Sequence, residues 1–140
     1  MATIFTRIIE GEIPGTFVWK DDRCVSFLSV NPLNRGHALV VPRVEVDHWL
    51  DADGDVRQHL FEVAHTIGRA QFAAFDVERI GVIIAGMEVP HLHIHVVPVN
   101  SESQLSFANA ATDVDREDLE AAAEDIRRHL EAAGETGVAR

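Results

Sequence analysis

The sequence predicts an α+β fold in which helices pack on one face of a five-stranded antiparallel sheet. Its periodic segments occur in the order helix, three strands, helix, two strands, helix, an order typical of α+β proteins. Most neighbouring strand segments are separated by short turns, which connect antiparallel strands. A chain of 140 residues buries roughly two-thirds of its unfolded surface. We therefore expect a single domain over residues 1–140, with its core at about 4–100 and a C-terminal loop and helix at about 101–134.

The N-terminal part of the chain is expected to form a short helix and three strands. Four apolar residues at helical spacing predict a helix at residues 4–10, which Gly11 can end: Ile4, Phe5, Ile8 and Ile9. Gly15 interrupts this pattern, and strands are expected at residues 16–20, 23–30 and 37–42. Asp21 and Asp22 form the turn between the first two strands, and Pro42 ends the third.

The C-terminal part is expected to contain two longer helices and two strands. Acidic residues at 51–55 can cap the start of a long amphipathic helix. The apolar residues of this helix recur at intervals of three and four residues: Val56, Leu60, Val63, Ile67, Ala70 and Ala74. A buried strand at 79–85, a connection at 86–89, and a polar loop at 100–109 follow from composition. Thr112 and Asp113 can cap a last helix that ends near Gly134 and packs through Leu119, Ala122, Ile126, Leu130 and Ala133.

The segment from Pro90 to Pro98 places histidines at every second position: His91, His93 and His95. Two-residue spacing predicts a strand that carries the three imidazoles on one face, because side chains alternate along a strand. The other face is aliphatic and is expected to join the core: Leu92, Ile94 and Val96. A helix is excluded, since residues two apart lie on nearly opposite sides of a helix.

Composition limits the classes of partner. Twelve Lys and Arg against 23 Asp and Glu give a net charge of −11, which argues against nucleic acid or anionic lipid as a partner. A small anionic ligand remains possible where backbone N–H groups and histidines meet it locally. The single cysteine, Cys24, cannot form an internal disulfide, and no leader peptide or membrane-spanning run is visible. We therefore expect a soluble, cytoplasmic protein.

Three chemistries fit three histidines on one face. A zinc site is one, but the sequence contains no HExxH motif and no cysteine pair that would complete it. Packing in the core is another, although three imidazoles would bury many polar nitrogens that need partners. The third is covalent catalysis, because a neutral imidazole can attack phosphorus without a separate base. The middle ring, His93, is then the candidate nucleophile, with His91 and His95 beside it.

Residues 91–97, with the sequence HLHIHVV, resemble the HxHxHxx signature of the histidine triad (HIT) superfamily, and the chain is similar to its bacterial members. The resemblance extends over most of the chain, through residues 5–14, 21–22, 27–32 and 36–42. It implies the HIT-like fold with its long amphipathic helix and C-terminal helix. It also implies a nucleotide hydrolase or transferase that acts on the α-phosphate of a nucleoside phosphoramidate, a nucleotidyl ester or a dinucleoside polyphosphate.

The resemblance assigns roles to eleven residues. It makes His93 the nucleophile that forms a nucleotidyl-histidine intermediate, with His95 binding the phosphate and His37 and His91 completing the cluster. The nucleotide-binding positions are Ile13, Phe27, Ser29, Val30, Gly86, Met87 and Glu88. The implied ligand is a purine nucleotide or nucleotide conjugate, and the implied assembly is a homodimer with the long helix at its interface. We expect no cofactor and no metal.

The sequence departs from the family pattern at several positions. Many bacterial members carry a Cys-x-x-Cys pair that binds structural zinc together with later histidines, whereas this chain has Thr3 and Thr6 there and Glu45 at a later histidine. Ser29 stands where an aspartate usually contacts the ribose. The loop before the triad is shortened, with Met87 where glutamine is frequent, and losing a donor there predicts slower catalysis or a different leaving group.

Two other functions compete with the hydrolase. A nucleotide-binding or interaction protein with little turnover is favoured by Ser29 and Met87. Labelling of His93 without turnover would distinguish this protein from an enzyme. A metal-dependent hydrolase that uses the triad as ligands predicts activity that is lost on chelation.

Overall fold

Five strands form one antiparallel sheet in the order β1-β2-β3-β5-β4. The structure is a computed structural model that describes residues 1–140. The longer elements are α1 (Ile4–Ile9), β1 (Phe17–Lys20), β2 (Cys24–Leu28), β3 (Ala38–Pro42), α2 (Gly54–Ala74), β4 (Arg79–Ile83), β5 (Ile94–Val99) and α3 (Arg116–Ala132). Short 3₁₀ helices lie at Trp49–Asp51, Glu102–Leu105 and Phe107–Asn109. The predicted α+β class and five-stranded antiparallel sheet are confirmed.

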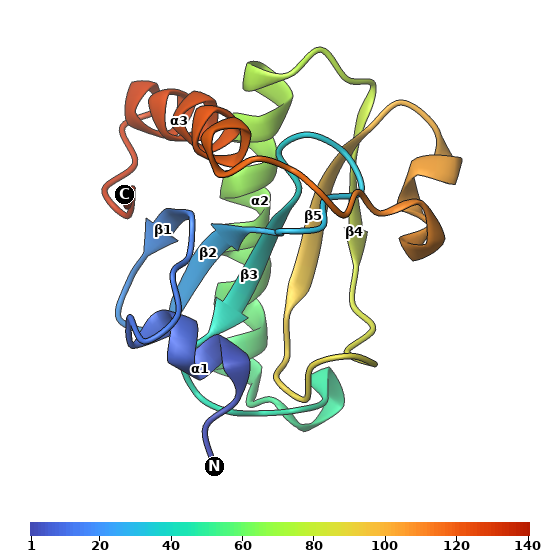
Figure 1. Ribbon diagram of the computed structural model, residues 1–140. Helices are drawn as coiled ribbons and strands as arrows, with labels where there is room; N and C mark the ends of the chain where they lie inside the picture. Colours follow the sequence, from blue (N-terminus) through green and yellow to red (C-terminus); the bar gives the residue numbers. More distant parts are fainter.

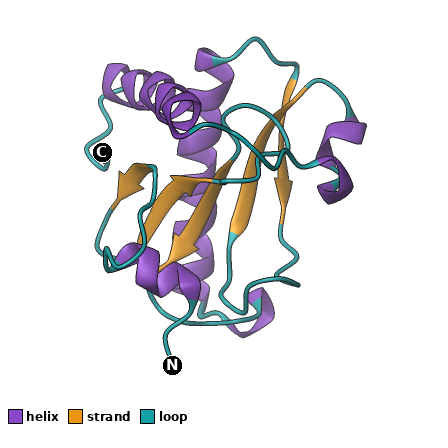
Figure 2. Cartoon of the chain, viewed as in Figure 1, coloured by secondary structure: helices purple, strands orange, loops and turns teal.

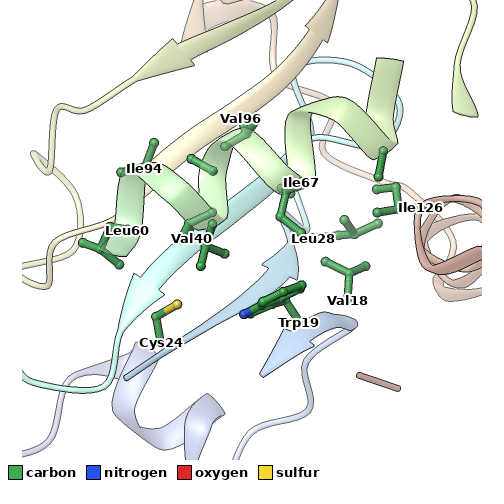
Figure 3. Close-up of a cluster of buried hydrophobic side chains, with 14 of the residues drawn as sticks. Val18, Trp19, Cys24, Leu28, Val40, Leu60, Ile67, Ile94, Val96 and Ile126 are labelled. Carbon is green, nitrogen blue, oxygen red and sulfur yellow. The ribbon is translucent and has the colours of Figure 1, made fainter. Parts of the chain in front are cut away.

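The main core lies between one face of the sheet and the helices α2 and α3 (Figures 1 and 3). Alternate residues of the strands face this layer, among them Val18, Leu28, Val40, Ile94 and Val96. The helices contribute Leu60 and Ile67 from α2 and Leu119, Ile126 and Leu130 from α3. Burying each large aliphatic side chain contributes about 1.5–3 kcal/mol. This layer fixes the positions of β3 and β5, the two central strands.

The short helix α1 packs on the opposite face of the sheet, in front of it in Figure 1. Phe5 and Ile8 of α1 form a smaller core with the strand residues that alternate with the first set, including Phe27 and Leu39. The expectation that helices cover one face is correct for α2 and α3 and wrong for α1. Because α1 has only six residues, it covers only part of this face.

The last strand begins later than the sequence predicts. β5 starts at Ile94, so His91, Leu92 and His93 lie in a loop that enters the strand, as the teal segment before β5 in Figure 2 shows. In the register that pairs Val40 with Ile94, Leu92 would lie opposite Pro42. Proline has no N–H to donate, so the ladder ends there. The Leu92 N–H donates instead to the carbonyl of Val46 at 2.7 Å.

The segment between β5 and α3 also differs from the expectation. The predicted polar loop at 100–109 contains two of the 3₁₀ helices. The last helix begins at Arg116 after the cap residue Asp115, and not at the predicted caps Thr112 and Asp113. Asp115 accepts the first helical hydrogen bonds through its carbonyl, from the N–H groups of Asp118 and Leu119.

The outer edge of β1 is covered by the C-terminal residues. The Lys20 N–H donates to the carbonyl of Gly137 at 2.9 Å, and the Ala139 N–H donates to the carbonyl of Val18 at 3.0 Å. Position 137 requires glycine, because a Cβ there would lie 2.4 Å from the Trp19 indole ring. At the opposite side of the sheet, β4 is the edge strand and has no such cover.

The long helix α2 also makes a polar attachment to the sheet. Gln71 is fully buried, and its Nε2 donates to the carbonyls of Gly36 and Val96, both at 2.9 Å. These two carbonyls lie next to the strand ends that carry His37 and His95. None of the helices combines the length and the apolarity that crossing a membrane requires.

Candidate functional site

A pocket of about 870 Å³ opens on the sheet face that α1 leaves uncovered. Its walls come from α1, the ends of β2 and β3, the connection 85–89, β5 and the chain between 107 and 119. Nine of the predicted site residues line it: Phe27, Ser29, Val30, His37, Gly86, Met87, Glu88, His93 and His95. The other two, His91 and Ile13, do not line it. The roles of all these residues stay predictions.

His37 and His95 form a hydrogen-bonded pair whose proton positions can be assigned. The Leu33 N–H donates to His37 Nδ1 at 3.0 Å, so a neutral His37 carries its proton on Nε2. His37 Nε2 lies 2.9 Å from His95 Nδ1 and therefore donates to it. His95 then carries its own proton on Nε2, the ring nitrogen left to face the pocket. One backbone N–H thus sets two tautomers and leaves a donor in the pocket.

Burial keeps this pair uncharged. Desolvation is the main cause that lowers the pKa of His37 to about 3, and the neighbouring histidines add to it. Desolvation likewise lowers the pKa of His95 to about 4, with His93 contributing. Both rings are neutral at pH 7, as the tautomer assignment requires.

The two ring nitrogens of His93 have the opposite roles to those of His95. Its Nδ1 lies 2.7 Å from the carbonyl of His91, and a carbonyl only accepts, so Nδ1 carries the proton. Its Nε2 therefore holds the lone pair. Burial lowers the pKa of His93 against a smaller opposing effect of that hydrogen bond. The ring packs edge-on against Phe5 and against His95, with 4.9 Å between centroids in each case.

His91 lies next to the pocket but outside its lining. Its Nε2 is 2.7 Å from the carbonyl of Pro42, and its Nδ1 is 2.7 Å from the Thr3 hydroxyl. Its ring also packs against Phe5, at 5.8 Å between centroids. The predicted separation of imidazoles from aliphatic residues is therefore confirmed, since Leu92, Ile94 and Val96 join the main core. The prediction that all three imidazoles project from a strand is wrong, because the strand begins after His93.

Six of the seven predicted nucleotide-binding positions line the pocket. Ser29 Oγ accepts from the Asn31 N–H at 3.2 Å, and the neighbouring Val30 is exposed. Met87 is 92% exposed and therefore holds no fixed contact. Ile13 instead packs at the edge of the smaller core beside α1.

Among the lining residues that sequence reasoning missed are Phe5, Phe107 and Arg116. Phe107 lies in the second 3₁₀ helix of the C-terminal loop, with its ring centroid 5.0 Å from that of His95. A phenylalanine isolated in a polar run was the available signal for its position. Arg116 is the only lysine or arginine in the lining, and no pattern in the sequence indicated that the start of α3 faces the pocket.

Comparison with known proteins identifies the family. The family model described as HIT domain matches residues 10–102, a span that contains β1 to β5 and all three histidines of the triad. The chain belongs to the HIT family.

Two relatives illustrate the range of sequence similarity. An uncharacterised HIT-like protein of Saccharolobus solfataricus is 36% identical over 104 residues, which cover 71% of this chain and 75% of that protein. A protein named as an adenylylsulfatase, from Arabidopsis thaliana, is 28% identical over 100 residues, which cover 68% of this chain and 51% of that protein.

Two solved HIT structures are similar over nearly the whole chain. A zinc-bound histidine triad family protein of Mycobacterium smegmatis has a TM-score of 0.82 and 26% identity and covers 96% of each chain. A hypothetical histidine triad nucleotide-binding protein of Sulfolobus tokodaii has a TM-score of 0.81 and 26% identity and covers 92% of each chain. The predicted HIT-like fold is therefore confirmed.

The residues at the expected zinc positions of this HIT chain do not fit a zinc ion. We call Thr3, Thr6, Glu45 and His91 the N-terminal network. Glu45 Oε1 accepts from the Thr6 hydroxyl at 2.6 Å and from the Thr3 N–H at 2.8 Å. Structural zinc is held by thiolates, imidazoles and carboxylates, whereas two of these four groups are neutral hydroxyls already engaged in hydrogen bonds.

A second group of metal-ligating atoms lies at the hairpin turn. The ligating atoms of Asp21, Cys24 and His59 lie within 4.8 Å of one another. Asp21 Oδ2 accepts from Trp19 Nε1 at 2.8 Å and lies 2.7 Å from His59 Nε2, and Arg23 occupies the other nitrogen of His59. Burial and the nearby carboxylate raise the pKa of the Cys24 thiol, which disfavours the thiolate that a metal needs. Hydrogen bonds therefore account for this group.

Proposed function

We propose that this HIT-family chain is a nucleotide hydrolase or transferase in which His93 attacks the α-phosphorus of its substrate. The observation that supports this most is the hydrogen bond from His93 Nδ1 to the His91 carbonyl, which leaves Nε2 with a lone pair. A neutral imidazole with a free Nε2 is a competent nucleophile toward phosphorus. The substrate class is a nucleoside phosphoramidate, a nucleotidyl ester or a dinucleoside polyphosphate.

The reaction proceeds in two balanced steps. In the first, the Nε2 lone pair forms a bond to the α-phosphorus while the bond from phosphorus to the leaving group breaks. The leaving group takes that electron pair and a proton from solvent. In the second step, water attacks the same phosphorus and returns one proton to solvent, the bond to His93 breaks with its electron pair returning to Nε2, and a nucleoside monophosphate is released.

The neighbouring donor ring is suited to the charge that develops on phosphate. His95 Nε2–H faces the pocket beside His93, because His37 occupies the other nitrogen of His95. A fixed donor aimed at a developing negative charge stabilises the transition state more than the ground state. An acceptor ring and a donor ring thus stand side by side, 4.9 Å apart at their centroids.

The walls of the pocket are suited to a purine base. Phe5, Phe27 and Leu39 supply apolar surface, and 15 of the 27 lining residues are hydrophobic, as is usual for small-molecule sites. The similarity to proteins named as nucleotide-binding and as an adenylylsulfatase supports the same ligand class. With Arg116 as the only cation in the lining, the phosphate relies mainly on uncharged donors such as His95 Nε2–H.

Burst kinetics with an adenosine phosphoramidate tests this function. We expect multiple turnovers, with an adenylyl group on His93 detectable by intact mass in the pre-steady state. The variant His93→Ala should lose both the adduct and the turnover. The variant His129→Ala, on α3 away from the pocket lining, is the matched control and should retain both. A His93→Ala protein that turns over at the normal rate would refute the proposal.

A second candidate function is a nucleotide-binding protein with little turnover. Two observations favour it: the Ser29 hydroxyl is engaged with the Asn31 N–H, and the exposed Met87 supplies no donor to the leaving group. This candidate predicts stoichiometric adenylylation of His93 without a steady state. The same burst experiment therefore separates the two functions.

We further propose that the chain forms a homodimer through α2 and β4. Phe61 and Phe72 on α2 and Val82 on β4 are 45%, 55% and 49% exposed, and they line one shallow apolar surface. β4 is also the uncovered edge of the sheet, with N–H and C=O groups available for pairing. A second copy of the chain satisfies both features, since it offers the same apolar surface and the same edge.

A further inference from the structure

The N-terminal network joins three segments that are far apart in the sequence. Thr3 and Thr6 belong to the first turn of α1, Glu45 to the loop after β3, and His91 to the loop before β5. Thr3 is also the cap residue of α1, because its hydroxyl accepts the Thr6 N–H at 3.1 Å. Side chains thus attach the loop before β5 to α1, in addition to the hydrogen bond from the His91 ring to the carbonyl of Pro42 at the end of β3.

The proton positions in this network follow from one fixed acceptor. The carbonyl of Pro42 can only accept, so His91 Nε2 carries a proton and donates to it across 2.7 Å. In the neutral ring, Nδ1 then holds the lone pair and accepts the Thr3 hydroxyl proton. The ring is completely buried, and both of its nitrogens are held.

The backbone at His91 has few other attachments. It lies outside the strand ladder, which on β5 begins only at Ile94. The N–H of His91 donates to the carbonyl of Val89, and the N–H of the next residue, Leu92, donates to the carbonyl of Val46. The orientation of the His91 carbonyl therefore depends on how firmly the ring of the same residue is held. That carbonyl is the group that fixes the tautomer of His93.

We propose that Thr3 and Glu45 are positioning residues for His93. Glu45 holds the first turn of α1 through Thr3 and Thr6, Thr3 holds the His91 ring, and the His91 carbonyl holds the Nδ1 proton of His93. The network acts through hydrogen bonds alone and needs no metal ion. The catalytic part of this inference rests on the proposed role of His93, whereas the tautomer part does not.

The variant Thr3→Val tests the link from α1 to His93. Valine keeps the shape of threonine but has no hydroxyl to donate to His91. We expect kcat for an adenosine phosphoramidate to fall about tenfold or more with little change in KM, because small misplacements of a reacting group are costly. We also expect nitrogen NMR of the histidine rings to show mixed tautomers at His93. The variant Thr3→Ser, which keeps the hydroxyl, should restore both readouts.

Glu45→Ala provides a second, independent change with a matched control. Asp47 lies two residues further along the same loop, is exposed, and makes no side-chain hydrogen bond. Glu45→Ala should reduce kcat and loosen the His93 tautomer, whereas Asp47→Ala should do neither. The inference fails if Thr3→Val and Glu45→Ala leave the single His93 tautomer intact. If the wild type shows one fixed tautomer that these variants lose, yet no turnover, the inference stands and the proposed function fails.

A grafted metal site tests whether the four side chains meet as described. The triple variant Thr3→Cys, Thr6→Cys, Glu45→His would place two thiolates and two imidazoles, including His91, around one point, a donor set that favours tetrahedral zinc. We expect this variant to bind one zinc ion per chain and to keep the wild-type His93 tautomer until a chelator is added. The wild type should be unaffected by the chelator. A folded triple variant that binds no zinc would overturn the geometry on which the inference depends.

Discussion

The histidines of this chain differ in what their two ring nitrogens do. A backbone N–H at Leu33 determines that His95 is a donor, and a backbone carbonyl at His91 determines that His93 is an acceptor. The two rings therefore have opposite hydrogen-bonding character although they are two residues apart and similarly buried. This contrast, more than the number of imidazoles, suits the site to attack on phosphate.

Removing the donor should slow the reaction far more than it weakens binding. We expect His95→Ala to lower kcat by about 10²–10³, the usual loss for one donor to a developing anion. His37→Phe should give a smaller loss, because His95 keeps its ring and loses only the fixed tautomer. Steady-state kinetics and nitrogen NMR of His95 check both variants. Equal kinetics for His37→Phe and wild type would show that the Leu33 to His37 connection is dispensable.

The buried histidines also predict an acid-sensitive fold. Burial lowers the pKa of His37 to about 3 and that of His95 to about 4, while both titrate at 6.5 when unfolded. Below pH 6.5 the unfolded chain therefore binds more protons than the folded chain. The free energy of unfolding is highest above this pH and declines as the pH falls toward 4. In this pH range, each of these histidines lowers the free energy of unfolding by about 1.4 kcal/mol for every pH unit. Asp21, with an unfolded pKa of 3.8, acts mainly at lower pH.

Urea unfolding at a series of pH values between 4 and 7.5 measures this effect. The variant His37→Phe should give a shallower decline of the unfolding free energy, since one of the histidines that take up a proton on unfolding is gone. An unfolding free energy that stays constant from pH 7.5 to 4 would contradict the assigned neutral forms.

The identities of these residues could be predicted from the sequence, but their hydrogen-bond partners could not. The two-residue spacing indicated correctly which of residues 91–96 enter the core, because alternation is a local property of extended chain. The pairing of His37 with His95 joins residues 58 apart, and that of His91 with Thr3 joins residues 88 apart. Such partners depend on strand register and on the placement of α1, which single-sequence patterns do not contain.

At the scale of elements, the ends of helices and strands were harder to predict than their existence. Every predicted strand and helix is present, and the errors concern where an element begins, which face it covers and how deeply it is buried. The strand at 79–85, which was expected to be buried, is the partly exposed edge strand β4. β5 begins late because Pro42 of β3 stands at the next position of the ladder. α1 lies on the other face because Phe5 and Ile8 match the smaller core. Neither cause can be seen in the segment that it affects.

The attachment of α2 to the two central strands should contribute measurably to stability. Gln71→Met keeps the length of the side chain but leaves the buried carbonyls of Gly36 and Val96 without their donor. We expect the unfolding free energy to fall by about 1–3 kcal/mol, the cost of leaving buried acceptors unpaired. Gln58→Met, at an exposed position of the same helix, is the control and should change little. Urea denaturation of both variants decides the matter.

For the whole molecule, the proposed homodimer is the property with the clearest test. Phe72→Glu and Val82→Glu place a charge on the exposed apolar surface of α2 and β4. We expect light scattering to report twice 15.5 kDa for the wild type and a single copy for either variant, because charges are depleted from the centres of interfaces. Val44→Glu, at an exposed position on the loop after β3, should remain a dimer. A wild-type protein that is monomeric would exclude the proposed assembly.

The overall charge and the site agree with each other at this scale. A chain with a net charge of −11 repels polyanions at a distance, yet the His95 Nε2–H in its pocket is available to the phosphate of the proposed ligand. The prediction that nucleic acid is not a partner rests on the repulsion between this net negative charge and a polyanion, and the sequence composition is sufficient to argue it. The arrangement inside the pocket required the fold.

The two rims of the sheet are unequal, and this asymmetry limits how copies can accumulate. One rim is occupied by the chain's own last residues at 137–139, while the other is bare. A molecule with two bare rims could recruit neighbours at both ends and grow into a filament, whereas one with a single bare rim completes its growth at a pair. For the proposed homodimer, we therefore expect that removing residues 137–139, which pair with β1, would turn a self-terminating association into an open-ended one.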